Sequence, residues 1–68
     1  MDDITRDKLR NAYEKLTNYR DQYRRVLVDR PDRADIWRGK IQASTMAMIF
    51  LWDEFEEVLK DFEPPVRP

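Results

Sequence analysis

The side chains with the clearest chemical potential in this sequence are seven basic residues in the middle of the chain. From position 20 to position 40 they outnumber the acidic residues seven to four. Guanidinium and ammonium groups bind phosphate, and the nearby Tyr19 and Tyr23 offer rings on which bases stack. One hypothesis is therefore a nucleic-acid-binding regulator that uses this Arg-rich segment. The residues of this basic set are Arg20, Arg24, Arg25, Arg30, Arg33, Arg38 and Lys40.

The acidic residues within the same segment argue against that hypothesis. Its four aspartates would repel the phosphates that the basic side chains attract. Mixed charge along a helix is also typical of an ordinary solvated face. Nucleic-acid binding is therefore kept as the alternative interpretation.

A run of carboxylates between positions 53 and 61 is the second group that suggests chemistry. Helical di-iron sites combine such residues with a Glu-x-x-His pattern, but this sequence contains no histidine and no cysteine. Ser44 and Thr45 have no neighbouring base that would activate a hydroxyl group. We therefore expect no catalytic residue, no metal and no cofactor, and hence a protein that is not an enzyme.

The basic set begins on the first of two predicted helices. Apolar residues recur at heptad spacing from Leu9 to Val26, which is the pattern of an amphipathic helix. Asp2 or Asp3 is a suitable N-cap. The spacing predicts a first helix over residues 3–29.

A break and a second helix follow. Pro31 disfavours helical geometry at the preceding residue and predicts a turn over 30–32. Apolar residues at the same heptad spacing, from Trp37 to Phe62, predict a second helix over 33–62. Asp32 is expected to cap it.

Such a short connection predicts that the two helices lie side by side and antiparallel. Facing residues should then have numbers that sum to about 64, and this register pairs apolar residues along the seam. It also places Arg10 beside Glu54, so that opposite charges flank the seam. The sequence therefore predicts an all-α fold, with residues 1–63 forming one helical hairpin.

The last residues, 64–68, are predicted to form an extended tail. Three of these five residues are proline, which favours a polyproline conformation. The segment from Pro65 to Pro68 matches a minimal PxxP pattern, although a simple helix stop is the preferred interpretation. We expect the tail to be mobile unless something holds it.

The second helix carries more apolar surface than one neighbouring helix can cover. Residues 41–52 contain no charged side chain. Small residues spaced four apart permit a close approach by another helix, and clustered exposed apolar residues usually mark an interface. The candidate residues for self-association or partner binding are Gly39, Ala43, Met46, Ala47, Ile49 and Phe50.

Self-association is the simplest use of this surface. A chain of 68 residues has a marginal core, and without cysteine it gains nothing from disulfides. Two hairpins related by a two-fold axis would build a four-helix bundle with coiled-coil-like packing. We therefore expect a homodimer, with another protein as the alternative occupant of the patch.

The composition favours a small soluble protein. Charged residues make up 40% of the chain, yet the formal net charge is only −1. The uncharged stretch is shorter than the roughly twenty residues that span a bilayer, and no signal peptide is evident. We expect a cytoplasmic location and no membrane contact.

These features together predict a non-catalytic protein–protein interaction module. We expect it to act as an assembly component, an adaptor or an inhibitor. Its small size and surplus of apolar surface are typical of accessory proteins of phages or mobile elements, in which case a virion-associated location is the alternative.

Overall fold

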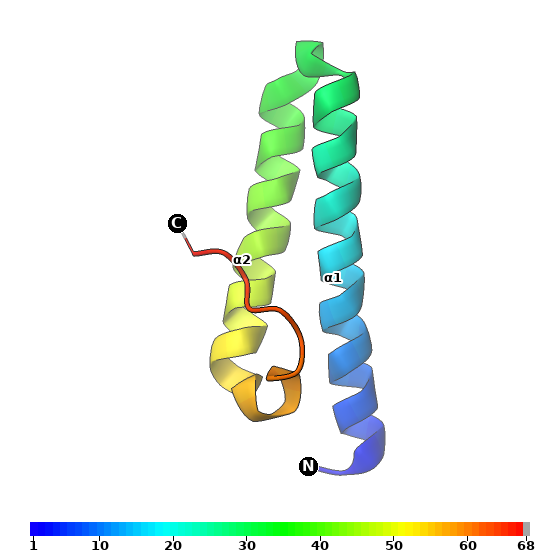
Figure 1. Ribbon diagram of the computed structural model, residues 1–68, viewed down its shortest axis with the longest axis vertical. Coiled ribbons are helices and arrows are strands. Elements are labelled where there is room, and N and C mark those ends of the chain that lie inside the picture. The colour runs from blue at the N-terminus through cyan, green and yellow to red at the C-terminus, as the bar shows by residue number, and fades with distance from the viewer. Residues whose placement is uncertain (68) are drawn as a thin grey trace.

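The computed structural model describes residues 1–67 and consists of two antiparallel helices (Figure 1). Helix α1 spans Asp3–Asp29, a 3₁₀ turn η1 spans Pro31–Arg33, and helix α2 spans Ala34–Leu59. The predicted all-α helical hairpin is confirmed. The molecule is elongated, with extents of 45 × 21 × 16 Å along its principal axes.

Residues next to each end of α1 account for where the helix begins and ends. The Asp2 carboxylate accepts a hydrogen bond of 2.7 Å from the backbone N–H of Thr5, which satisfies a donor that the helix leaves free. This hydrogen bond lowers the pKa of Asp2, because it favours the charged carboxylate. At the other end the N–H of Arg30 donates to the carbonyl of Val26 at 2.8 Å, and Pro31 then ends the helix.

The cap predicted for the second helix is wrong. Arg33 rather than Asp32 occupies the N-cap position of α2, and no side chain bonds to the free N–H groups there. The chain instead enters α2 through η1, where the N–H of Arg33 donates to the carbonyl of Arg30 at 3.2 Å. The fixed φ of Pro31 suits the first residue of such a turn. The 3₁₀ turn thus moves the cap position one residue along the chain.

Helix α2 ends at Leu59, three residues before the end predicted from the sequence. Phe55 already departs from helical geometry, with φ −132° and ψ 35°, and the last turn bends there. In a continuing helix the N–H of Phe62 would donate to Val58, but here it donates to the carbonyl of Leu59 at 2.9 Å. The guanidinium of Arg10 on α1 donates to the Val58 carbonyl instead, at 2.9 Å. A side chain from the neighbouring helix therefore satisfies a carbonyl that the end of α2 leaves free.

The core lies in the open half of the hairpin, away from the turn. Tyr13, Met48 and Leu59 are at most 1% exposed. The ring of Tyr13 lies with its centre 6.0 Å from that of Trp52 and 5.5 Å from that of Phe62. The partly buried residues packed against this core are Leu16, Leu51, Trp52, Phe55 and Phe62.

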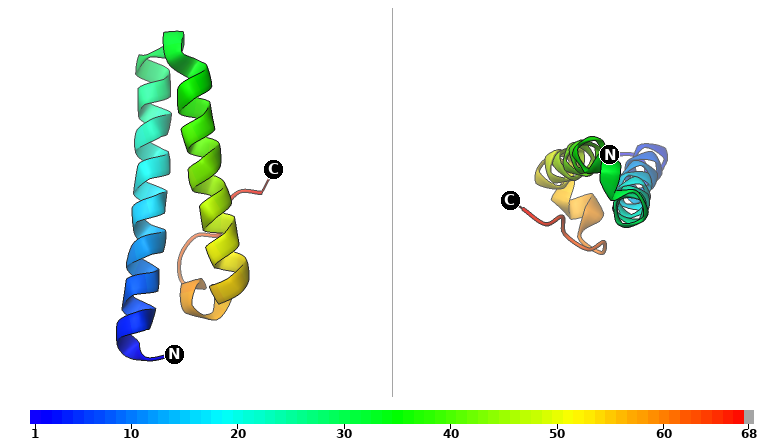
Figure 2. Two further views of the ribbon diagram at one scale, coloured as in Figure 1. Left: turned by 180° about the vertical axis from the view of Figure 1, so that it is seen from behind. Right: turned by 90° about the horizontal axis from the view of Figure 1, so that it is seen from above.

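Residues 63–67, called the tail below, fold back over the hairpin (Figure 1). Seen along the helices, the chain after α2 lies to one side of the plane that contains the two helices (Figure 2). Pro68, the last residue of the predicted tail, lies outside the described residues. The chain therefore adds a short third layer to the two helices.

Three contacts hold the tail in place. The hydroxyl of Tyr13 donates to the carbonyl of Glu63 at 3.0 Å. Pro65 is buried, and Arg67 forms an ion pair with Asp53 on α2. The sequence left open whether anything holds the tail, and the structure shows that the hairpin does.

Neither helix is long and apolar enough, over the part of the chain described, to cross a bilayer.

Candidate functional site

The outer face of α2 is a row of apolar and small residues on the side of the helix opposite α1. Its members are three or four residues apart and so share one side of the helix. Ile36 and Met46 are each 52% exposed, and Phe50 is 66% exposed. On the opposite side Met48 and Ser44 are buried. The outer face consists of Ile36, Gly39, Ala43, Met46 and Phe50.

The structure divides the six residues predicted for self-association into two groups. Ala47 and Ile49 are half-buried and lie at the margins of the row. The other four are exposed and belong to the outer face, and these are Gly39, Ala43, Met46 and Phe50. The predicted patch is therefore mostly one continuous surface.

Sequence reasoning missed one member of this surface, Ile36. The signal was present, because Ile36, Ala43 and Phe50 are seven residues apart and form a second heptad row on α2. Gly39 lies between these apolar positions, and a side chain built there would meet nothing within 4 Å. The packing of the hairpin itself therefore does not require a glycine at this position.

The basic set does not form a single surface, because two of its members are engaged within the hairpin. The side chain of Arg20 is only 11% exposed. Lys40 places its ammonium nitrogen 5.6 Å from the ring centre of Tyr23 and 5.7 Å from that of Trp37. Arg24 is also exposed but lies 3.8 Å from Asp21, and the exposed arginines near the turn with no ion pair within residues 1–67 are Arg25, Arg30, Arg33 and Arg38.

Aromatic rings pack the hairpin near the turn. Tyr19 and Tyr23 are stacked with their ring centres 6.2 Å apart, and the centres of Tyr23 and Trp37 are 5.9 Å apart. The ring N–H of Trp37 is buried and has no hydrogen-bond partner within residues 1–67. The tyrosines proposed as stacking platforms for bases are therefore stacked on each other, Tyr23 also packs on Trp37, and Tyr19 stays 50% exposed.

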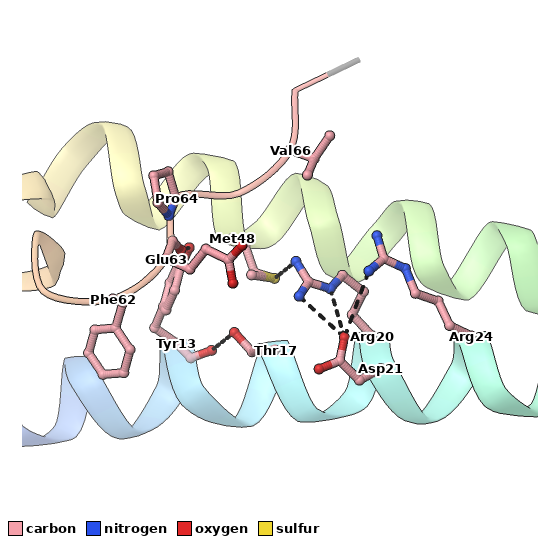
Figure 3. A pocket seen from close by; sticks show the side chains of 10 residues that line it. All are labelled: Tyr13, Thr17, Arg20, Asp21, Arg24, Met48, Phe62, Glu63, Pro64 and Val66. Atoms are coloured by element: carbon pink, nitrogen blue, oxygen red, sulfur yellow. Dashed lines mark hydrogen bonds and ion pairs between the residues drawn. The ribbon is translucent and has the colours of Figure 1, made fainter.

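A cavity of about 440 Å³ lies between the tail and α1 (Figure 3). The part of its wall that belongs to the two helices is called the tail groove below. Its residues are Tyr13, Thr17, Arg20, Asp21, Arg24 and Met48. The tail borders the same cavity with Glu63, Pro64 and Val66, and Phe62 closes one end. The tail therefore fills only part of the space beside it.

One carboxylate, that of Asp21, forms ion pairs with two guanidinium groups on the wall of the tail groove. Arg20 donates to Asp21 at 3.3 and 3.2 Å, and the Arg24 guanidinium lies 3.8 Å from the same carboxylate. Another nitrogen of Arg20 is 3.9 Å from the sulfur of Met48. Without the tail, the helical wall would therefore carry a net positive charge.

Tyr13 supplies the polar group at the other end of the groove. Burial raises the pKa of its hydroxyl, so the group keeps its proton and remains a donor. Figure 3 shows the side chain extending from α1 to the tail at Glu63. Thr17 donates back to the carbonyl of Tyr13 at 3.1 Å within α1. The groove thus offers a fixed hydrogen-bond donor to a main-chain carbonyl.

The end of the tail reaches the margin of the outer face. Val66 is 68% exposed. It lines a second cavity, of about 200 Å³, together with Met46 of the outer face. The remaining residues around this cavity are Arg24, Gln42, Thr45 and Arg67. The tail groove and the outer face are therefore neighbouring surfaces.

Two of the carboxylates considered as metal ligands are used in ion pairs. Arg10 forms two hydrogen bonds of 2.7 Å with Asp61, which lowers the pKa of Asp61 to about 2. The hydrogen bond from Arg67 lowers the pKa of Asp53 in the same way. Arg10 thus pairs with Asp61, whereas the sequence register placed it beside Glu54. The early end of α2 accounts for the difference, because it brings residues 60–62 back toward α1.

Comparisons of the chain with protein-family models, with curated proteins and with solved structures gave no match.

Proposed function

We propose that the protein is a non-catalytic interaction module that self-associates through the outer face of α2. In this proposal two hairpins form a four-helix bundle that acts as an assembly component, an adaptor or an inhibitor. The observation that carries it is the exposure of Ile36, Met46 and Phe50, each more than half exposed on one side of a helix. Covering such a row with a second copy would remove apolar surface from water.

The charge distribution along α2 favours an antiparallel contact between the two copies. Residues 33–40 contain three basic side chains and one acidic side chain, whereas residues 53–57 contain four acidic side chains and no basic one. A two-fold axis that crosses α2 between Ala43 and Met46 brings the basic part of each copy beside the acidic part of the other. A parallel contact would instead place like charges together.

The shapes of the side chains favour the same arrangement. Around that axis Gly39 of one copy lies opposite Phe50 of the other, because both positions are about equally far from the axis. A glycine gives the ring room, and small residues allow helices to approach closely. This arrangement gives Gly39 a role that packing within one hairpin does not.

Sedimentation equilibrium over a wide range of concentrations tests the proposal. We expect the wild-type chain to reach twice the monomer mass, and we expect Phe50→Asp to remain a monomer with its helical circular dichroism intact. The matched control is Val28→Asp, because Val28 is 80% exposed but lies on α1. Val28→Asp should dimerise like the wild type.

Two results would contradict the proposal. One is a wild-type chain that stays monomeric at every concentration. The other is a Phe50→Asp variant that dimerises as strongly as the wild type.

A nucleic-acid-binding regulator is the second candidate. It is favoured by the four exposed arginines near the turn and weakened by three exposed aspartates among them, Asp29, Asp32 and Asp35. Phosphate contacts weaken steeply with added salt, whereas contacts through apolar surface do not. Binding of RNA or DNA that vanishes between 50 and 200 mM salt, roughly the range over which such contacts fail, would support this candidate.

A further inference from the structure

The tail lies on the helices in the way that a bound peptide lies on its receptor. Its contacts are those of a short extended ligand: one main-chain carbonyl bonded by Tyr13, one buried ring at Pro65, and one charged side chain paired with Asp53. Residues 63–67 contain no helical turn or strand of their own. The two consecutive prolines restrict this segment to extended conformations.

We propose that the tail groove is a binding site for extended proline-containing segments of a partner protein, and that the tail occupies this site within its own chain. The segment it fits has the order acidic residue, Pro, Pro, apolar residue, basic residue. This inference does not depend on self-association of the chain.

The chemistry of the groove explains why prolines suit it. Proline has no N–H group, so a proline-rich segment is recognised through its carbonyls and its rings. Tyr13 supplies a protonated hydroxyl to the carbonyl that precedes Pro64. Its ring lies with its centre 5.5 Å from that of Phe62, and these two aromatic side chains line this end of the cavity. Aromatic-lined grooves are the usual surfaces that bind polyproline segments.

The charges define the two ends of the segment. Asp53 pairs with a basic residue two positions after the second proline, as Arg67 shows. Further along the groove from Tyr13, Arg20 and Arg24 share Asp21 as their only ion-pair partner within residues 1–67. An acidic residue before the prolines, the position of Glu63, complements this excess of positive charge. Asp53, beside the tail groove, therefore sets the basic end of the segment, and the positive charge of the groove favours an acidic residue before the prolines.

The contacts of the tail with the groove are weak enough for another peptide to displace it. The ion pair between Arg67 and Asp53 is half exposed on both sides, and exposed ion pairs contribute little. The cavity of about 440 Å³ shows that the tail does not fill its site. Attachment to α2 nevertheless gives the tail a high effective concentration. A free peptide should therefore bind weakly to the intact chain and more tightly once the tail's own docking is weakened.

The test uses the full chain and a fluorescein-labelled peptide, Glu-Pro-Pro-Val-Arg, with fluorescence anisotropy as the readout. Arg67→Glu places two negative charges together at Asp53 and should release the tail. We expect Arg67→Glu to bind the peptide at least tenfold more tightly than the wild type. The matched control is Arg25→Glu, an exposed arginine away from the groove, which should bind like the wild type. A peptide with both prolines replaced by alanine should bind at least tenfold more weakly.

NMR spectra of the ¹⁵N-labelled chains show where the peptide binds and whether the tail has moved. The proposal predicts that Arg67→Glu changes the signals of Tyr13 and Trp52, and that added peptide moves them back toward their wild-type positions. It is overturned if the tail leaves and no peptide binds, or if the peptide shifts signals away from the groove. It is equally overturned if Arg67→Glu leaves the tail in place and the peptide does not bind, because the tail is then a fixed part of the fold.

Discussion

Arg10 forms a bidentate ion pair with Asp61, 51 residues further along the chain, and both nitrogen–oxygen distances are 2.7 Å. The same guanidinium donates to the carbonyl of Val58 and lies 4.8 Å from the ring centre of Phe62. Arg10 therefore contacts three groups at the point where α2 ends and the chain turns toward the tail. One residue of α1 thus links the last turn of α2 to the segment that follows it.

The ion pairs at this end predict that acid destabilises the protein. Asp61 has a pKa of about 2 in the folded chain, below the ordinary value of 3.8, and the pKa of Asp53 is lowered in the same direction. Both carboxylates therefore stabilise the fold at pH values above their ordinary pKa, and this contribution is lost as the pH falls through the lowered pKa, which for Asp61 is about 2. The urea midpoint, followed by tryptophan fluorescence, should decrease through this range.

The variant Asp61→Asn separates this effect from general acid unfolding. It should have a lower urea midpoint than the wild type at pH 7. Its urea midpoint should fall by a smaller amount between pH 7 and pH 2.5, because one of the titrating carboxylates is gone. Glu14→Gln is the control, because Glu14 is exposed and forms no ion pair within residues 1–67. An Asp61→Asn variant with the wild-type pH dependence would show that the ion pair adds nothing to stability.

The hydrogen bond from Tyr13 to Glu63 predicts a measurable role in stability. In Tyr13→Phe the ring remains in the core while the carbonyl of Glu63 loses its donor. We expect a loss of about 1 kcal/mol in the free energy of unfolding, the usual value for one such bond. Urea denaturation measures it, with Tyr19→Phe as the control because Tyr19 is 50% exposed. Equal stability of the two variants would mean that the tail contact does not contribute.

The antiparallel dimer predicts a specific pattern of crosslinking. The chain has no cysteine, so a single introduced cysteine reacts only with its counterpart in a second copy. Ala43→Cys lies near the proposed axis and should form a disulfide-linked dimer under mild oxidation. Ile36→Cys should not, because at 1.5 Å per residue its two copies would be ~25 Å apart. Crosslinking of both variants, seen on a non-reducing gel, would indicate a parallel contact instead.

Much of the hairpin could be predicted from the sequence, because its helices depend on local features. The N-cap at Asp2 and the break at Pro31 act within a few residues of the chain. The heptad spacing of apolar residues fixes which side of each helix faces the other. Most of the outer face of α2 was predicted for the same reason. It consists of apolar residues of α2 that do not belong to the heptad row facing α1. Ile36 was missed although the same spacing includes it.

The tail groove could not be predicted from local sequence features. The tail groove depends on Tyr13 meeting Glu63 and on Asp53 meeting Arg67. Nothing in the local sequence indicates that a proline-rich end returns to the helix it has just left. Tyr13 appears in the sequence as a residue at the margin of the first apolar row, yet it is 1% exposed in the core.

The sequence by itself therefore determined the two helices, the turn between them and the apolar surplus on α2. These features follow from interactions between residues at most a few turns apart, which act before the chain is compact. The tertiary structure alone decided where α2 stops, which residues form the core, and where the tail lies. Those outcomes depend on side chains some fifty residues apart, such as Arg10 and Asp61. The bend at Phe55 and the end of α2 at Leu59 lie in the same part of the chain as these contacts.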